Sequence, residues 1–270
     1  MGAGIGTVAQ ARDTAVLKGR LAPVAEPERQ RRPAPVMLLP GMARSRLSLR
    51  RMAGGLAAAG FEVYNVGSPG PRLPLEIQVS RFRSSLERLG RELARRHGEP
   101  PLMHGVGHSM GGIVLRAALA QADGIVPGRM VAIATPFLGA RVADLVCRHR
   151  LPRLALGSAL LDLSWRSAAI RRLAASVGEQ PAVGVVLGRR GFQPLLPAAW
   201  INAYLGLEDT DGTIAPASAR GDGLWAPPAD VLLVEAGHTF MAEKAEVIRQ
   251  TAHFLTHGRF MRADQSLSDI

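Results

Sequence analysis

Six residues, Gly107-His108-Ser109-Met110-Gly111-Gly112, place a serine between glycines at the junction of two apolar segments. The run 101–106 before them is typical of a short buried strand, and 113–121 after them has apolar residues at helical spacing. A serine on a sharp turn between strand and helix has strained backbone angles, so the residues two before and two after it must lack side chains. We therefore predict a strand-turn-helix unit that holds the Ser109 hydroxyl out above a sheet, in the form of a nucleophile elbow.

The alternation of strand and helix continues on both sides of this unit. Further strands are predicted at 36–39, 61–66, 129–134, 183–187 and 231–234, and further helices at 46–59, 75–97 and 243–257. This order predicts an α/β fold with a mostly parallel central sheet and helices on both faces. Ligands bind at the carboxyl ends of such strands, and both Ser109 and the turn at Gly41 fall there.

The chain divides by composition into an arm, one large domain and a tail. Residues 1–34 contain prolines and glycines without sustained periodicity, which predicts a mobile N-terminal arm. The α/β domain is expected at 35–260 and a C-terminal tail at 261–270. Within the domain, 141–180 is rich in leucine and adds no strand. A small helical cap over the site and ordinary surface helices explain that segment about equally well.

Composition favours a globular protein with a solvated exterior. The formal net charge of +11 comes almost wholly from arginines spread along the chain, since Lys18 and Lys244 are the only lysines, and no nucleic-acid partner is expected. No apolar run is long enough to span a bilayer, and the first eleven residues lack a positively charged start, so a cytoplasmic location is expected. Cys147 is the only cysteine, which excludes an intrachain disulfide and a cysteine metal cluster.

A serine nucleophile needs a base, and the base needs a carboxylate to fix its tautomer. His238 lies in a short loop between a late strand and the last helix, where it could reach back to Ser109. For the acid we favour Asp211, which precedes a glycine and then an apolar position, over Asp209. Asp222 and Asp230 are later turn residues with weaker claims. The order serine, acid, histidine is thus present.

Two backbone N–H groups are predicted to hold an oxyanion. The N–H of Met110 lies at a helix N-terminus, and that of Met42 follows Pro40-Gly41 in the turn after the first core strand. No metal site is predicted. His104 and His108 are four apart but belong to a strand and its turn, and His253 and His257 share a helix face without a third ligand.

Taken together, these residues make the chain resemble the α/β-hydrolase superfamily, in particular its bacterial lipase- and esterase-like serine hydrolases. The likeness runs from about 36 to 260 and rests on the elbow, on Leu38-Leu39-Pro40-Gly41-Met42, on Asp211-Gly212 and on His238. Thr135-Pro136-Phe137-Leu138-Gly139 is similar to a Thr-Pro-His-x-Gly loop of many lipases. Pro40 and Phe137 depart from the family, which usually has histidine at both places.

The resemblance implies hydrolysis of carboxylic esters through an acyl-enzyme on Ser109, with no cofactor. The expected partner is a small-molecule acyl ester, with lipid-like esters included. An acyltransferase using the same triad and a catalytically silent binding module of the same fold remain open as alternatives. The sequence does not determine the oligomeric state.

Overall fold

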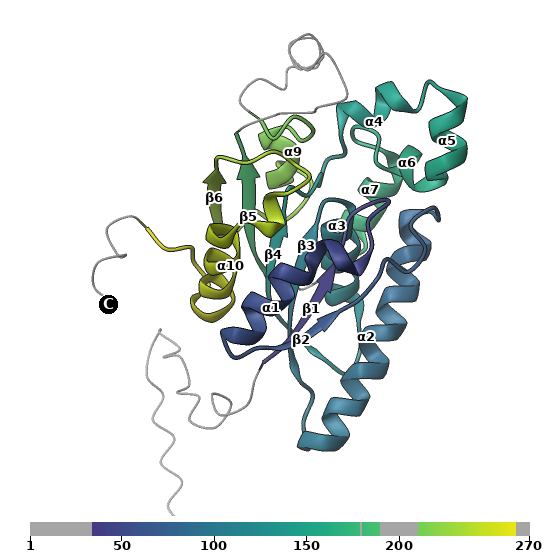
Figure 1. Ribbon diagram of the computed structural model, residues 1–270. Coiled ribbons are helices and arrows are strands. Elements are labelled where there is room, and N and C mark those ends of the chain that lie inside the picture. Colours follow the sequence, from purple (N-terminus) through teal and green to yellow (C-terminus); the bar gives the residue numbers. More distant parts are fainter. Residues whose placement is uncertain (1–33, 179, 190–209, 263–270) are drawn as a thin grey trace, which may run out of the picture. The chain divides into compact units, whose positions relative to one another are not determined.

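A parallel sheet forms the centre of the chain (Figure 1). The computed structural model describes residues 34–178, 180–189 and 210–262, and within them the six strands follow the order β2-β1-β3-β4-β5-β6. The strands are β1 Pro35–Leu39, β2 Glu62–Asn65, β3 Leu102–His108, β4 Val126–Ile133, β5 Ala182–Gly188 and β6 Asp230–Val234. The predicted fold class is confirmed. The predicted arm, apart from residue 34, and the tail beyond 262 lie outside the described residues.

Helices follow the strands, as the periodicity predicts. They are α1 Arg50–Ala58, α2 Leu75–His97, α3 Met110–Gln121, α4 Arg141–Val146, α5 Arg150–Leu156, α6 Ser158–Asp162, α7 Ala168–Ala175, α9 Pro216–Arg220 and α10 Ala245–His257. Several predicted bounds shift by a few residues: the strand predicted at 129–134 is β4, and the helix predicted at 113–121 begins at Met110. Two helix starts also involve a 3-10 turn. The segment 46–59 starts as a 3-10 turn, η2 (Arg46–Leu49), because the Ser45 side chain accepts a hydrogen bond from the Leu47 N–H. The last helix starts after a second 3-10 turn, η3 (Met241–Glu243).

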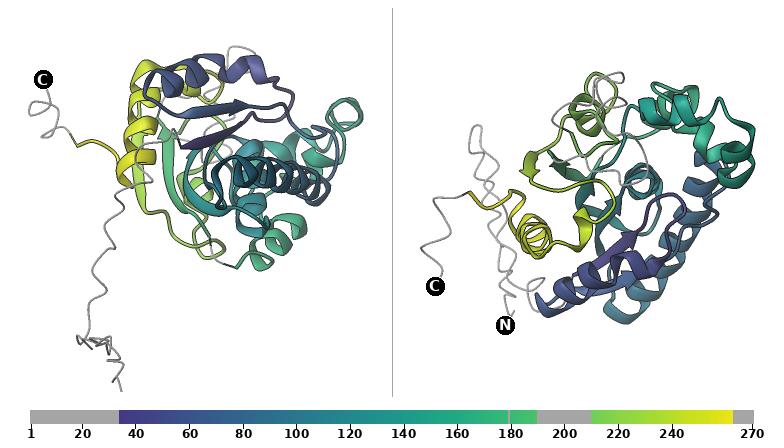
Figure 2. Two further views of the ribbon diagram at one scale, coloured as in Figure 1. Left: turned by 90° about the horizontal axis from the view of Figure 1, so that it is seen from below. Right: turned by 45° about the horizontal axis from the view of Figure 1, so that its top comes forward.

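Alternate residues of the strands bury the two faces of the sheet. In β1, Val36 and Leu38 pack in a cluster with side chains of α1 and α10, whereas Met37 and Leu39 pack in a second cluster with α2, α3 and α7. This is the period of two expected of a strand covered on both sides. Figure 2 shows α1 and α10 on one face and α2 and α3 on the other. Each face of the sheet is therefore closed by helices, and the edge at the carboxyl ends is left for the site.

The leucine-rich segment 141–180 forms α4 to α7 between β4 and β5. It is tied to the start of α2, because the carboxylate of Asp162 accepts a hydrogen bond of 2.8 Å from the Leu75 N–H. Arg172 of α7 also pairs with Glu76 of α2 at 2.6 Å. Helix α7 thus packs as a surface helix, while α4 to α6 lie toward the carboxyl ends of the strands (Figure 1). That these helices cap the site stays a prediction.

Candidate active site

Ser109 stands between the end of β3 and the start of α3, with φ of 53° and ψ of −129°. A positive φ is unfavourable for a residue with a side chain and must be held by its surroundings. The Ser109 N–H bonds the carbonyl of Ile133 at 2.9 Å, which continues the ladder between β3 and β4 past the end of the strand. A side chain at Gly107 would collide with the backbone of Gly112, and one at Gly111 with the backbone of β1. The glycines therefore permit the predicted turn.

His238 and Asp211 complete a chain of hydrogen bonds to this serine. His238 Nε2 lies 3.1 Å from Ser109 Oγ, and His238 Nδ1 lies 2.9 Å from Asp211 Oδ2. Since a carboxylate only accepts, Nδ1 carries the proton and Nε2 is left as the acceptor for the serine hydroxyl. The three predicted residues are thus placed together, in the geometry of a base between a nucleophile and an acid. The alternative acid, Asp209, lies outside the described residues.

The carboxylate of Asp211 is held by its own loop. Its side chain is 2% exposed, and Oδ1 accepts hydrogen bonds of 2.8 Å from the N–H groups of Thr213 and Ile214. Hydrogen bonds from two backbone donors offset the loss of water around a buried carboxylate. The remaining oxygen, Oδ2, is directed to His238.

Gly188, the last residue of β5, lets the acid and base loops converge. A side chain there would lie 2.8 Å from Cβ of Asp211 and would also overlap the carbonyl of Ala236. The absence of a side chain allows the two loops to cross the end of β5 in close contact. The sequence offers no signal for this role of Gly188 beyond a glycine that ends an apolar strand.

The turn after β1 packs directly on the elbow. A Cβ on Gly41, the residue before Met42, would lie 2.9 Å from Cβ of Ser109. Met110 begins α3, and the first N–H groups of a helix have no partner within it. The Met110 side chain is buried in the core, and its sulfur accepts a hydrogen bond from Gln78. The oxyanion role of Met42 and Met110 stays a prediction.

His108 lies against His238, although the sequence pattern indicates for it only the metal-ligand spacing with His104 that we discount. It is 3% exposed, and its Nε2 lies 3.0 Å from the backbone carbonyl of His238. Burial, followed by the nearby charge of His238, lowers the pKa of the His108 ring to about 3. The ring is therefore neutral at physiological pH. Its position directly before the nucleophile is the one signal in the sequence that could have revealed it.

Two other histidines, His104 and His253, have structural partners. His104 Nδ1 accepts a hydrogen bond of 2.8 Å from the Arg129 N–H, and burial lowers its pKa to about 4. His253 bonds the carbonyl of Arg259 at 2.8 Å, and Cys147 is half-buried. Within the described part of the chain, no group of three His, Cys, Asp or Glu side chains could hold a metal ion. Nor is any helix there both long and apolar enough to cross a bilayer.

Phe137 stands where the similar Thr-Pro-His-x-Gly loop of lipases has histidine, and its side chain belongs to the core. Its ring is fully buried and lies 5.5 Å from the ring of Trp225, whose Nε1–H donates to the Phe137 carbonyl. The guanidinium of Arg116, on α3, lies over both rings at 4.8 and 4.9 Å. Such stacking stabilises a buried cation. Phe137 thus supports the helix behind the nucleophile through its contact with Arg116.

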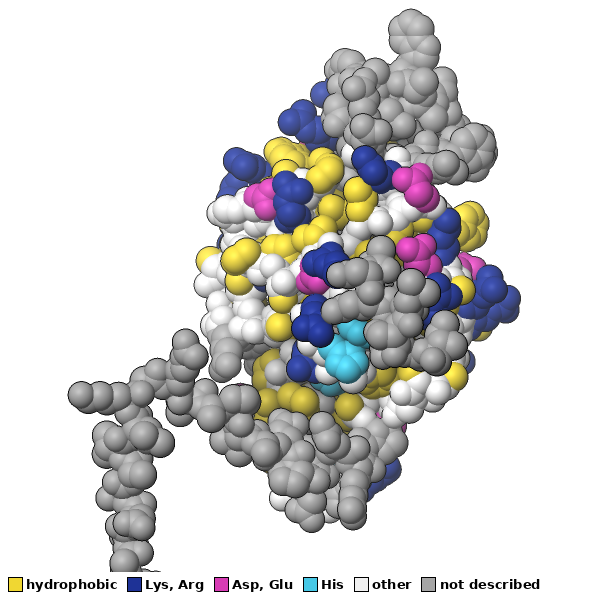
Figure 3. Space-filling view, turned by 90° about the vertical axis from the view of Figure 1, so that its left-hand side faces the viewer, with side chains coloured by type: hydrophobic (Ala, Val, Ile, Leu, Met, Phe, Trp, Pro, Cys, Tyr) yellow, Lys and Arg dark blue, Asp and Glu magenta, His cyan; other side chains and the backbone are white. Residues whose placement is uncertain are grey.

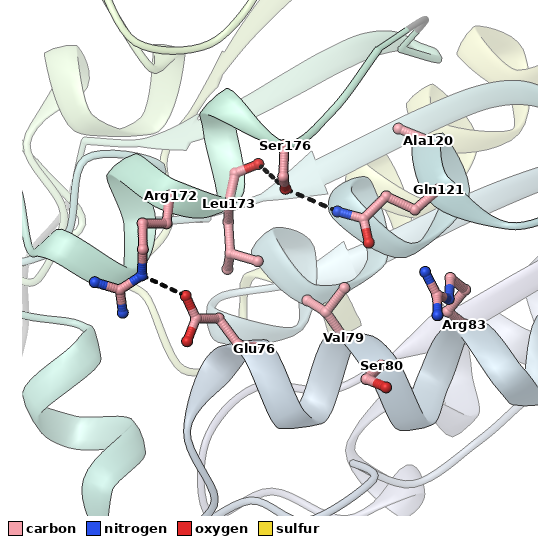
Figure 4. Close-up of a pocket in the computed structure, with 9 residues that line it drawn as sticks. All are labelled: Glu76, Val79, Ser80, Arg83, Ala120, Gln121, Arg172, Leu173 and Ser176. Carbon is pink, nitrogen blue, oxygen red and sulfur yellow. Dashed lines mark hydrogen bonds and ion pairs between the residues drawn. The ribbon is translucent and has the colours of Figure 1, made fainter.

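A groove of about 550 Å³ lies on another part of the surface. Figure 4 shows its lining from α2, α3 and α7, where Gln121 donates to Ser176 and Arg172 pairs with Glu76. None of the residues around Ser109 lines it. Figure 3 shows one side of the molecule, on which Lys and Arg side chains are interspersed with acidic and hydrophobic ones outside the grey region. That side carries no continuous basic face among its described residues.

Comparison with known proteins places the fold. No protein-family model and no curated protein matches the sequence. Among solved structures, the propeptide form of lipase BlEst2 from Bacillus licheniformis superposes with a TM-score of 0.65 and 16% identity, over 83% of this chain and 50% of that one. A metagenomic carboxyl esterase superposes with a TM-score of 0.61 and 16% identity, over 89% of this chain and 80% of that one. Phospholipase PlaB from Legionella pneumophila superposes with a TM-score of 0.57 and 16% identity, over 76% of this chain and 53% of that one.

The parallel sheet, the elbow after β3 and these likenesses define an α/β-hydrolase fold. More narrowly, the solved structures that the chain resembles include lipases and esterases. The chain spans half the length of the propeptide form of the Bacillus lipase.

Proposed function

We propose that the protein is a serine hydrolase of carboxylic esters, with Ser109 as nucleophile, His238 as base and Asp211 as the acid that orients the base. One observation carries the proposal: Asp211, His238 and Ser109 form a continuous hydrogen-bonded chain, with contacts of 2.9 and 3.1 Å, that ends on a serine with strained backbone. Strain of this kind concentrates at functional positions.

The reaction follows from the proton positions. Ser109 Oγ attacks the ester carbonyl while its proton passes to His238 Nε2, which gives a tetrahedral oxyanion. The oxyanion collapses, the C–O bond to the alcohol breaks, and Nε2 returns the proton to the departing oxygen. Water then attacks the acyl-enzyme, with its proton taken by the same nitrogen, and release of the carboxylic acid restores Ser109. Asp211 stabilises the charged imidazole throughout.

The N–H groups of Met42 and Met110 are proposed to bind the oxyanion. Met42 follows Gly41, where an added Cβ would lie 2.9 Å from Cβ of Ser109, and Met110 is the first residue of α3. Each donor of this type is worth about 3 kcal/mol of activation free energy. Neither contribution depends on the methionine side chain.

We propose that the substrates include esters of long, lipid-like acyl chains. Large apolar side chains are exposed on segments that follow the carboxyl ends of strands: Leu47 at 66% after β1, Phe240 at 66% after β6, and Leu151 and Leu154 at 79% and 77% on α5. Phe240 is only two residues from His238. The printed names of the structural neighbours, a lipase and a carboxyl esterase among them, agree with this class.

Hydrolysis of p-nitrophenyl esters tests the proposal. Ser109→Ala removes the nucleophile, so turnover of a short ester falls by several orders of magnitude, up to about a millionfold. The matched control is Ser84→Ala, an exposed serine on α2 whose hydroxyl bonds only its own helix. If the Ser109 variant cleaves the ester as fast as the control, the assignment is wrong. A series of p-nitrophenyl esters with acyl chains of increasing length tests the substrate class. If long-chain esters are substrates, kcat/KM rises with the length of the acyl chain.

A further inference from the structure

His108 has a contact that the proposed reaction does not use. Its Nε2 lies 3.0 Å from the backbone carbonyl oxygen of His238, and the two rings are 5.2 Å apart and inclined by 45°. A carbonyl oxygen can only accept, so His108 Nε2 carries a hydrogen and donates it. The donor is the residue next to the nucleophile, and the acceptor belongs to the base.

This contact adds to the hydrogen bonds that hold the loop of His238, among them one from Arg44 to the Thr239 carbonyl. His238 lies between β6 and η3 in a stretch without helix or strand. Its backbone N–H donates to the carbonyl of Asp211 at 3.1 Å, and its Nδ1 bonds the Asp211 carboxylate at 2.9 Å. Asp211 thus holds two polar groups of His238, and His108 holds a third.

The surroundings keep the His108 ring in its donating form. The ring is buried, and the charged or titratable groups that act on it are His238, Arg44 and Asp211. Burial lowers its pKa to about 3, so His108 does not compete with His238 for the proton of Ser109. Its Nδ1 also faces the turn at Gly41, since a Cβ there would lie 3.4 Å from that nitrogen.

We propose that His108 is a positioning residue that sets the distance between His238 Nε2 and Ser109 Oγ by holding the His238 carbonyl. Because His108 and Ser109 are consecutive, one rigid unit fixes both the nucleophile and the loop of the base. This inference rests on the proposed function and assigns no chemical step to His108. Displacement of a reacting group by about 1 Å can cost about a hundredfold in rate.

Two substitutions separate positioning from packing. His108→Leu removes the donor, whereas His108→Gln retains an N–H donor at about the same distance from the backbone. His104 supplies the control, because it is also buried in β3 but accepts from Arg129 and does not contact His238. His104→Leu disturbs the packing of the same strand and leaves the His238 loop alone.

The measurements are kcat and KM for a short soluble ester, urea unfolding, and amide hydrogen exchange of residues 237–240. We expect His108→Leu to lower kcat about 10- to 100-fold with KM unchanged and to speed exchange in the loop. His108→Gln restores most of both, and His104→Leu lowers stability without lowering kcat. Should His108→Leu not fold, His108→Met is the second apolar variant.

Two results overturn the proposal: a folded apolar variant with the parental kcat and loop exchange, or a glutamine variant as impaired as the apolar one. A parent protein that does not hydrolyse esters would instead overturn the proposed function. In that case loop exchange still reports whether His108 holds the His238 loop. The two failures are therefore distinguishable.

Discussion

At the scale of single residues, the site depends on positions where a side chain is missing. Gly107, Gly111 and Gly188 each lie where a Cβ would overlap neighbouring backbone. The first two allow the strained turn at Ser109, and the third lets the Asp211 and His238 loops approach each other. These glycines act on geometry alone, so their effect can be measured without reference to chemistry.

Gly111→Ala tests this requirement. The new methyl group would overlap the carbonyl oxygens of Leu39 and Pro40, which are backbone atoms and cannot move aside cheaply. We expect a loss of about 2 kcal/mol in the free energy of unfolding, measured with urea. Gly54→Ala is the matched control, because Gly54 also lies in a helix but a Cβ there meets nothing within 4 Å. That variant gains about 0.5–1 kcal/mol. Equal effects at the two positions would contradict the geometry.

The buried histidines predict acid sensitivity. The pKa of His104 is lowered to about 4 and that of His108 to about 3, both mainly by burial, with Arg129 and His238 respectively adding to the effect. The unfolded chain, with an ordinary pKa near 6.5, therefore binds more protons than the folded protein once the pH falls below that value. Stability is full above about pH 6.5 and is lost toward pH 4, with each histidine contributing up to about 1.4 kcal/mol per pH unit.

Unfolding by urea at pH 7, 6, 5 and 4.5 checks this expectation. His104→Gln removes one of the two groups, so its free energy of unfolding should fall less steeply than that of the parent between about pH 6 and pH 4.5. The expected difference in slope is about 1.4 kcal/mol per pH unit. Identical slopes for the parent and the variant would show that His104 takes up its proton in the folded protein as easily as in the unfolded one.

At the scale of elements, local patterns predict what local forces determine. The apolar runs at 36–39 and 183–187 identify β1 and β5 because a parallel strand covered on both faces needs apolar side chains on both. The helix predicted at 75–97 matches α2, whose C-terminus is set by Gly98 at a φ of 82°. Where a side chain bonds nearby backbone, as Ser45 does at η2, the pattern misses the 3-10 turn.

Contacts between distant parts of the sequence could not be predicted in this way. The order of turns predicts a nucleophile, an acid and a base, but the bond from His108 to His238 spans 130 residues and leaves no periodic trace. The same holds for Asp162, whose bond to Leu75 spans 87 residues. Such contacts depend on which loops the fold brings together, and that is set by the packing of the whole domain.

Asp162→Ala tests how firmly the segment 141–180 is attached. Helix α2 starts at Leu75 after Pro74, which has no side-chain donor or acceptor to cap it, and the carboxylate of Asp162 takes that part instead. Loss of a cap of this kind costs about 1 kcal/mol. Asp222→Ala serves as the control, since Asp222 is exposed and pairs only with Arg220, two residues away, so its loss should change little. Equal urea stability of the two variants would contradict an attached segment.

At the scale of the whole molecule, the fold and the function stand on different observations. The sheet order and the likeness to lipases and esterases establish an α/β-hydrolase fold, and at 16% identity they establish the fold alone. The function rests on a few atoms at the carboxyl ends of β3, β5 and β6. A fold can persist after its chemistry is lost, so a test of function must address those atoms. The cytoplasmic location stays a prediction.

The most direct test of the atoms around Ser109 is to label the folded protein with a fluorophosphonate and to locate the adduct by peptide mass spectrometry. The reagent phosphonylates a serine only when a base activates it, so activation of Ser109 by His238 can be read without knowledge of the natural ester. We predict one adduct per chain on Ser109, none on the Ser109→Ala variant, and much slower labelling of His238→Gln. A folded parent that acquires no adduct, or acquires it on another serine, would contradict the proposal.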